Sequence, residues 1–156
     1  IKAGTIIFSM SVLIWLLQTY TPSLQVATDS TESMFGIIGA FIAPILIPLG
    51  FGTWQAGVSI LSGLVAKEAV VSSMLVLYAA SNEAELMTIL SGVFTPLSAF
   101  TFMVFCLLYV PCISAFVTIK REMGSWKWAL ASAGMQIGIA YIVSLAIYQI
   151  GSLFIR

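Results

Sequence analysis

The sequence feature that most constrains the fold is a series of long apolar segments without charge. Residues 4–20, 97–119 and 128–154 contain no charged side chain, and about 20 mostly apolar residues suffice for a helix to cross a bilayer core about 30 Å thick. The whole chain is 60% hydrophobic and 8% charged, whereas soluble domains are about 45–50% apolar and about 25% charged. We therefore expect an all-α, polytopic bundle of transmembrane helices whose first partner is the lipid bilayer.

Charge and residue counts exclude several functions. The net charge is zero and no basic run occurs, so the chain lacks the positive surface with which proteins bind nucleic acids. Histidine is absent, which excludes catalysis or zinc binding by histidine. No phosphate loop or nucleophile elbow is present, which predicts that this chain is not an enzyme. Cys106 and Cys112 lie six residues apart in one apolar stretch, too far for a disulfide on a continuous helix, and we expect free thiols.

Hydropathy and helical periodicity predict about five spans and one interfacial helix. Pro44 and Pro48 interrupt the second span, which is therefore either a broken crossing or a re-entrant element. Asp29 and Glu32 are expected to cap its start, and Thr53 the start of the third. The spans are predicted at residues 4–20, 31–50, 53–78, 97–119 and 126–154, with an amphipathic interfacial helix at 81–95.

Basic residues predict the orientation of these spans. Lys120, Arg121 and Lys127 cluster between the fourth and fifth spans, and short loops rich in Lys and Arg stay cytoplasmic. Five crossings then place Lys2 inside as well, and only Arg156 disagrees. An odd number of spans also fits one half of an inverted-repeat transporter.

Lys67 and Glu68 are the most informative charged residues. On a continuous third span they would lie near the middle of the bilayer, where each charge costs about 2.5–3.5 kcal/mol or more. Neighbours on a helix do not face each other, so their partners are expected on other helices, with Ser72 one turn beyond Glu68 as a supporting polar group. Two interpretations stay open: a polar clamp between helices, or the border of a cation path.

A second candidate lies at the proline of the fourth span. Pro111 cannot donate to the Leu107 carbonyl, and unwound backbone inside a bundle can supply oxygens to a cation. Cys112 adds a sulfur suited to a transition metal, although a buried cysteine is also a small hydrophobe. Cys106, Met74 and Met103 are interpreted as packing.

Three motifs resemble the ferrous iron transport protein B (FeoB) family. They are GLVAKEAVVS at 63–72, YVPCI at 109–113 and KREMGSWKWA at 120–129. The resemblance covers nearly the whole chain and implies the C-terminal portion of a FeoB-like transmembrane domain over residues 1–156, including the second Gate motif with Cys112 at the family's cysteine position. The GTPase domain and the first Gate motif of the family are absent from this sequence.

The resemblance implies ferrous iron uptake across the bacterial inner membrane, with Fe(II) as substrate and no cofactor held by this segment. GTP would act only through the missing N-terminal half, which is the expected protein partner, and a homo-oligomer stays open. Cys112, Glu68 and the Leu107 carbonyl are the expected metal path, with Lys67, Pro111 and Ser72 in support. The alternatives are a Gate-type transporter of another solute, such as a nucleoside, and a non-transporting membrane scaffold.

Overall fold

The fold of the chain is all-α, as expected. A computed structural model describes residues 2–21, 33–65, 67 and 69–154. Over these residues the chain forms α1 (Lys2–Thr19), α2 (Met34–Leu46), the short 3₁₀ helix η1 (Ile47–Leu49), α3 (Trp54–Gly63), α4 (Ala69–Leu77), α5 (Glu83–Val93), α6 (Pro96–Leu108), α7 (Ile113–Met123) and α8 (Trp126–Phe154).

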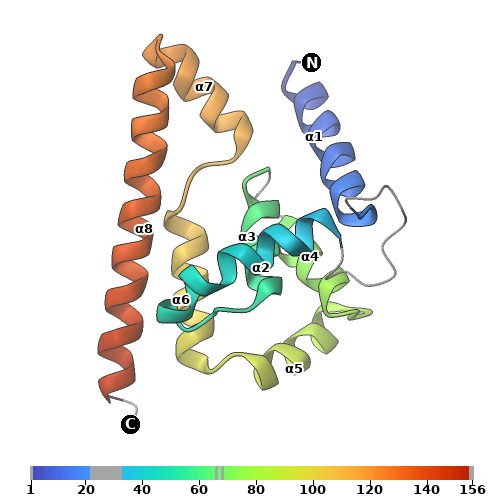
Figure 1. Ribbon diagram of the computed structural model, residues 1–156, viewed down its shortest axis with the longest axis vertical. Coiled ribbons are helices and arrows are strands. Elements are labelled where there is room, and N and C mark those ends of the chain that lie inside the picture. Colours follow the sequence, from blue (N-terminus) through green and yellow to red (C-terminus); the bar gives the residue numbers. More distant parts are fainter. Residues whose placement is uncertain (1, 22–32, 66, 68, 155–156) are drawn as a thin grey trace.

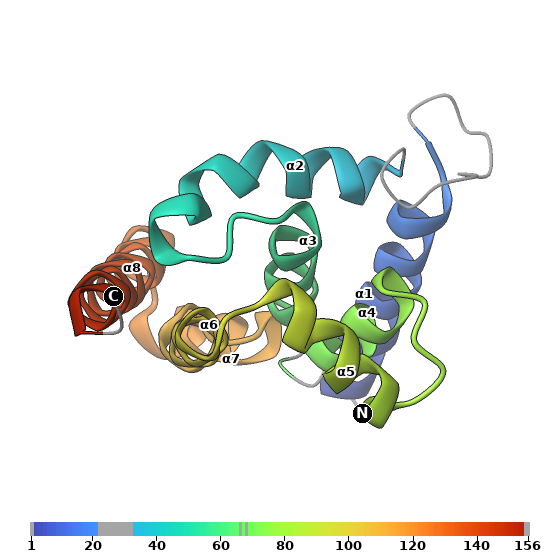
Figure 2. The same ribbon diagram turned by 90° about the horizontal axis from the view of Figure 1, so that it is seen from below.

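The helices surround α3, and the longest of them forms one edge of the bundle. α8 runs the full height of the molecule, and α7 folds back beside its N-terminal end (Figure 1). Seen from below, α3 lies at the centre, α2 crosses one side of it, and α8 and α1 stand at opposite edges (Figure 2). α2 packs closely on α3, and α6 packs closely on α8.

Small residues allow the close approach of α2 and α3. A Cβ atom on Gly57 would lie 2.7 Å from the Gly39 carbonyl oxygen, so the two backbones touch where a side chain has no room. Next to this contact, aromatic rings fill the core: Phe51 meets Phe102 edge-on at 5.2 Å between centroids and lies 5.8 Å from Phe105. These contacts join the α2–α3 pair to α6.

Side-chain caps fix the start of four helices. Ser33, Thr53, Asn82 and Thr95 each accept a hydrogen bond from the backbone N–H three residues ahead, which satisfies one of the free donors of a first helical turn. The cap predicted at Thr53 is confirmed. The pair predicted to cap the second span, Asp29 and Glu32, lies outside the described residues.

Several predicted elements match the structure. The first predicted span corresponds to α1, the interfacial segment to α5, and the fifth span to α8. The break predicted at Pro111 is also present, because α6 ends at Leu108 and α7 begins at Ile113.

Two predicted features of the spans are wrong. Pro44 does not break α2, which continues past it to Leu46; the predicted interruption is present instead at Pro48, where the chain turns into η1. The third span is not one continuous helix, because α3 ends at Gly63 and α4 begins at Ala69. Lys67 therefore lies in an interruption between two helices rather than on a helix.

Five spans were expected, of which the second and the fourth were predicted to be interrupted by proline. Within the described ranges, α8 is the helix that is both long and apolar enough to cross a bilayer. The number rises to three if α2–η1 with α3, bent by 102°, and α5 with α6, bent by 115°, each form one bent span. The physical reason is that the apolar segments are divided by helix breaks, which hydropathy alone does not register.

Large apolar side chains cover much of the outer surface. Phe41, Met87, Leu107 and Leu153 are each more than 70% exposed, and such side chains recur along α1, α2 and α8. Contiguous apolar surface of this extent marks contact with lipid or with other protein. The bundle is therefore a helical membrane domain.

Candidate functional site

The candidate site is a crossing of two interrupted helices. One interruption lies between the end of α3 at Gly63 and the start of α4 at Ala69, and the other lies between α6 and α7, at residues 109–112. The N–H of Ile113, which starts α7, donates to the carbonyl of Leu64 at the end of α3 over 2.8 Å. A backbone hydrogen bond thus joins the two interruptions directly.

The end of α6 is set by proline chemistry. Pro111 has no N–H, so the helix cannot continue its hydrogen bonding to Leu107, and the residue before a proline is pushed toward an extended conformation. Tyr109 already leaves the helix, with ψ at 177°, and Cys112 is extended with φ −55° and ψ 159°. The backbone therefore unwinds from Tyr109 to Cys112.

The C-terminal end of α3 continues into a tighter, 3₁₀-type turn. The N–H groups of Leu64 and Val65 donate to carbonyls three residues back, at 3.2 and 3.1 Å, which is 3₁₀ geometry at a helix end. Gly63 is buried here, and an added Cβ would collide with the Tyr109 hydroxyl and lie 2.6 Å from a methyl group of Val70. Glycine at this position lets Tyr109 reach across the break.

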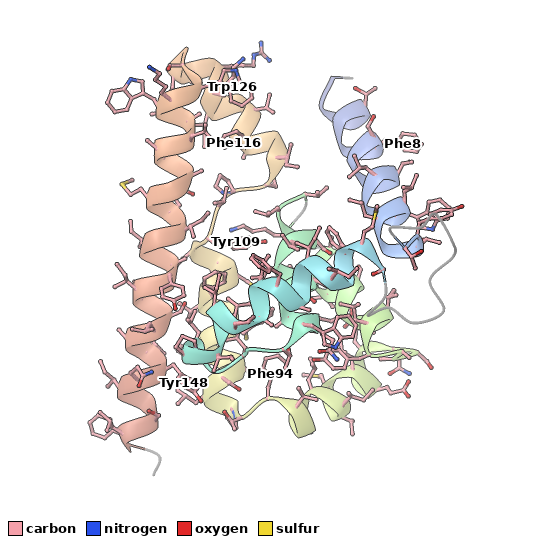
Figure 3. All side chains as sticks on the ribbon, viewed as in Figure 1. Phe8, Phe94, Tyr109, Phe116, Trp126 and Tyr148 are labelled. Carbon is pink, nitrogen blue, oxygen red and sulfur yellow. The ribbon has the colours of Figure 1, made fainter. Side chains whose placement is uncertain are left out.

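Tyr109, at the end of α6, connects α6 to α3. Its hydroxyl donates to the Ile60 carbonyl on α3 over 3.1 Å, and its ring stacks on Phe105 at 5.7 Å between centroids. Tyr109 is 3% exposed and lies in the middle of the molecule (Figure 3). Tyr109 was not among the predicted site residues, although a tyrosine in an apolar span needs a partner for its hydroxyl.

Lys67 bridges the two interruptions. Its ammonium donates to the Leu107 carbonyl over 3.0 Å and lies 5.3 Å from the centroid of the Tyr109 ring. Both partners are electron-rich and uncharged, and each attracts a cation. As expected, the partner of Lys67 belongs to another helix, and the carbonyl that Pro111 leaves free is the one Lys67 uses.

The other expected site residues make no hydrogen bond that joins the two interruptions, or lie outside the described residues. Cys112 is a half-buried free thiol at the N-cap of α7, and its side chain makes no capping hydrogen bond. Pro111 is half-buried beside it, whereas Ser72 is exposed on α4. Glu68 lies outside the described residues.

A cavity of about 780 Å³ opens beside the crossing, between α4, α5 and α6. Lys67, Leu107 and Cys106 line its end nearest the crossing, and Glu83 contributes a second charge from α5. Most of the remaining wall is apolar, and it includes Met74 and Met103. Cys106 and these methionines were predicted to be packing residues, and their position around one cavity was not predicted.

The described residues form no dedicated metal-binding cluster. Within the ranges 2–21, 33–65, 67 and 69–154, no group of three or more His, Cys, Asp or Glu side chains could hold a metal ion. From the described residues, the crossing offers a cation the Leu107 carbonyl oxygen, the Tyr109 ring and the Cys112 thiol.

Comparison with known proteins identifies this arrangement. Interrupted helices that meet inside an apolar bundle define a helical membrane domain of the kind found in transporters. The chain belongs to the Gate family, whose model, described as "Nucleoside recognition", matches residues 1–126.

Curated relatives carry one recurring name. The chain is 43% identical to the Fe(2+) transporter FeoB of Staphylococcus aureus strain COL over 99% of its length, and 39% identical to the Fe(2+) transporter FeoB of Methanocaldococcus jannaschii over 97%. A fusion of Fe(2+) transport protein A with FeoB from Porphyromonas gingivalis is 39% identical over 79% of this chain. These matches confirm the resemblance to the FeoB membrane domain.

The matches cover only part of each relative. The chain spans 23% of the Staphylococcus aureus and Methanocaldococcus jannaschii proteins and 16% of the fusion protein. No solved structure matches the chain.

Proposed function

We propose that this chain forms part of the path by which a FeoB-type transporter carries Fe(II) across a membrane. The names of the relatives support the substrate, since they are called Fe(2+) transporters and align with nearly all of the chain. The single structural observation that carries the proposal is the position of Lys67. Its ammonium is a cation held by a backbone carbonyl and an aromatic ring. The same two groups could attract a metal cation in its place.

The unwound backbone is the first element of the proposed path. A carbonyl released from its helix can replace part of the hydration shell of an ion, as carbonyls do in selectivity filters. The Leu107 carbonyl has this property because Pro111 cannot bond to it. Fe(II) is proposed to contact the same oxygen that now accepts from Lys67.

Lys67 and Fe(II) cannot share the site. A single charge and a double charge 4 Å apart repel by about 8 kcal/mol at an effective dielectric constant of about 20. The ion therefore reaches the Leu107 carbonyl only after the ammonium of Lys67 has swung away, toward the cavity that the same side chain lines. Lys67 thereby acts as a tethered cation that keeps the path closed.

Cys112 and Glu68 are proposed to complete the path. The Cys112 thiol lies next to the unwound segment and is not engaged in capping, so it is free to contact a transition metal. Glu68 follows Lys67 directly in the sequence, and its carboxylate is proposed to offset the charge of the passing ion. Ser72 is proposed as a supporting polar group on α4.

The remaining expectations belong to the whole transporter and are proposed with it. A GTPase domain and a first Gate motif are proposed for the rest of the protein, with GTP acting there. The transporter is proposed to be a multi-pass protein of the bacterial inner membrane, and a homo-oligomer remains a prediction.

Uptake of radiolabelled Fe(II) by cells that depend on the whole transporter tests the proposal. Cys112→Ser and Glu68→Gln should each lower uptake at least tenfold at normal expression, whereas Cys106→Ser, on α6 about one turn before the unwound segment, should lower it less than Cys112→Ser does. Normal uptake by both site variants would reject the site. Uptake of a nucleoside but not of iron by the unaltered protein would reject the substrate.

A further inference from the structure

Half of the basic residues of the chain gather at one corner that the proposed transport path does not use. Lys120, Arg121 and Lys127 fall within eight positions, and the chain contains six Lys and Arg in all. The first two end α7, and the third stands in the first turn of α8. Glu122 is the one acidic residue in this stretch, so the corner carries a net charge of about +2.

The corner has a fixed shape. Gly124 reverses the chain between α7 and α8 in the left-handed conformation, with φ at 63°. The ring of Trp126 then packs against Phe116 at 6.3 Å between centroids, and the ammonium of Lys120 lies 4.9 Å from the centroid of the Trp126 ring. Figure 3 shows Phe116 and Trp126 together where the two helices join. The cations are thus presented on a packed turn.

The length of α8 gives the depth of the corner in a bilayer. Its 29 residues extend over about 43 Å, and a bilayer including its headgroup regions is about 40–45 Å thick. If α8 spans the bilayer, its length places its first turn at headgroup level. Trp126 and Trp128, 57% and 66% exposed, are the side chains that favour this level.

We propose that the α7–α8 corner binds the phosphate of anionic phospholipids. Lys120, Arg121 and Lys127 would contact the headgroup, and the indole rings of Trp126 and Trp128 would lie against the glycerol and upper acyl region. The exposed tryptophans favour a lipid over a soluble polyanion, since indoles settle where apolar chains meet water. α7 supports the same orientation, because its basic residues are confined to its last turn.

Native mass spectrometry of the whole protein, released from nanodiscs, tests the proposal. Nanodiscs of phosphatidylcholine with phosphatidylglycerol should yield protein that retains phosphatidylglycerol preferentially. The triple change Lys120→Gln, Arg121→Gln and Lys127→Gln should weaken this preference at least tenfold, since each cation near an anionic surface contributes about fivefold. Lys120→Arg with Lys127→Arg, which conserves the charge, should keep the preference.

Further variants and controls distinguish lipid binding from the other outcomes. If the triple variant does not fold, Lys127→Gln alone should still lower the preference about fivefold, and high salt should lower it in the unaltered protein. Unchanged retention by a folded triple variant would overturn the proposal. Equal competition by inorganic phosphate, or cross-linking of a photoreactive group at position 128 to protein rather than lipid, would overturn the assignment to lipid.

Discussion

The ammonium of Lys67 donates a hydrogen bond to the Leu107 carbonyl over 3.0 Å, although forty residues separate the two in sequence. The bond connects the interruption after α3 with the end of α6. It uses an oxygen that the following proline leaves without its helical donor. Stability and transport should therefore depend on the residues that build this crossing.

Tyr109→Phe should destabilise the crossing. The change removes the hydroxyl that donates to the buried Ile60 carbonyl, and loss of a buried hydrogen bond costs about 1–3 kcal/mol. Thermal unfolding of the whole protein in detergent measures the effect. Tyr141→Phe is a matched control, because Tyr141 also donates to a distant carbonyl, that of Ile45, but at an exposed position; its loss should be smaller. Equal effects would show that Tyr109 has no special place in the crossing.

Gly63→Ala should lower both stability and Fe(II) uptake. The new methyl group would collide with the Tyr109 hydroxyl and Val70, and overpacking of this kind costs about 1–3 kcal/mol. Gly92→Ala, on α5, has the opposite expectation, because nothing lies within 4 Å of the added atom and alanine is the better helix former by about 0.5–1 kcal/mol. Both variants are compared by melting temperature and uptake. A Gly63→Ala protein as stable as the Gly92→Ala protein would contradict the packing described.

Pro111→Ala should reduce Fe(II) uptake without unfolding the protein. Alanine supplies an N–H that can bond to the Leu107 carbonyl and extend α6, so the oxygen is withdrawn from both Lys67 and a passing ion. Uptake together with helix content from circular dichroism measures the change. Uptake equal to that of the unaltered protein, with a demonstrable gain in helix, would mean that the unwound segment is not on the path.

Fe(II) should protect Cys112 from alkylation. A thiol that contacts the ion reacts more slowly with a maleimide, and the labelling rate in membranes should fall several-fold when Fe(II) is added without air. Cys106, in a variant that keeps it as the single cysteine of this region, should show the smaller change. Equal protection of both thiols, or of neither, would contradict the assignment of Cys112 to the path.

Local sequence patterns predicted the helices but not their meeting point. α1 and α8 could be predicted because long uncharged segments suffice to specify them, and the break before α7 because Pro111 lacks a donor. The break between α3 and α4 was missed, since no proline marks it. At this break the Ile113 N–H donates to the Leu64 carbonyl. This contact joins segments that are distant in the sequence, so local patterns do not reveal it.

Pro44 and Lys67 show two further limits of prediction from local patterns. Pro44 lies two residues before the C-terminal end of α2, so the one bond that it cannot donate, to the Ala40 carbonyl, is lost in the last turn, and the helix ends shortly after it. Lys67 was recognised as a charge that needs a partner inside the bundle, yet periodicity could not show that the partner is a backbone carbonyl and the ring of Tyr109. Residues from distant segments meet in ways that local spacing does not encode.

The most direct measurement is passive Fe(II) entry into proteoliposomes containing the whole transporter with Lys67→Met. Removing the tethered ammonium should raise the entry rate at least several-fold, while Lys67→Arg, which keeps the charge, should leave it near that of the unaltered protein. A folded Lys67→Met protein that admits Fe(II) no faster than the unaltered one would contradict the account of Lys67 as the cation that closes the path.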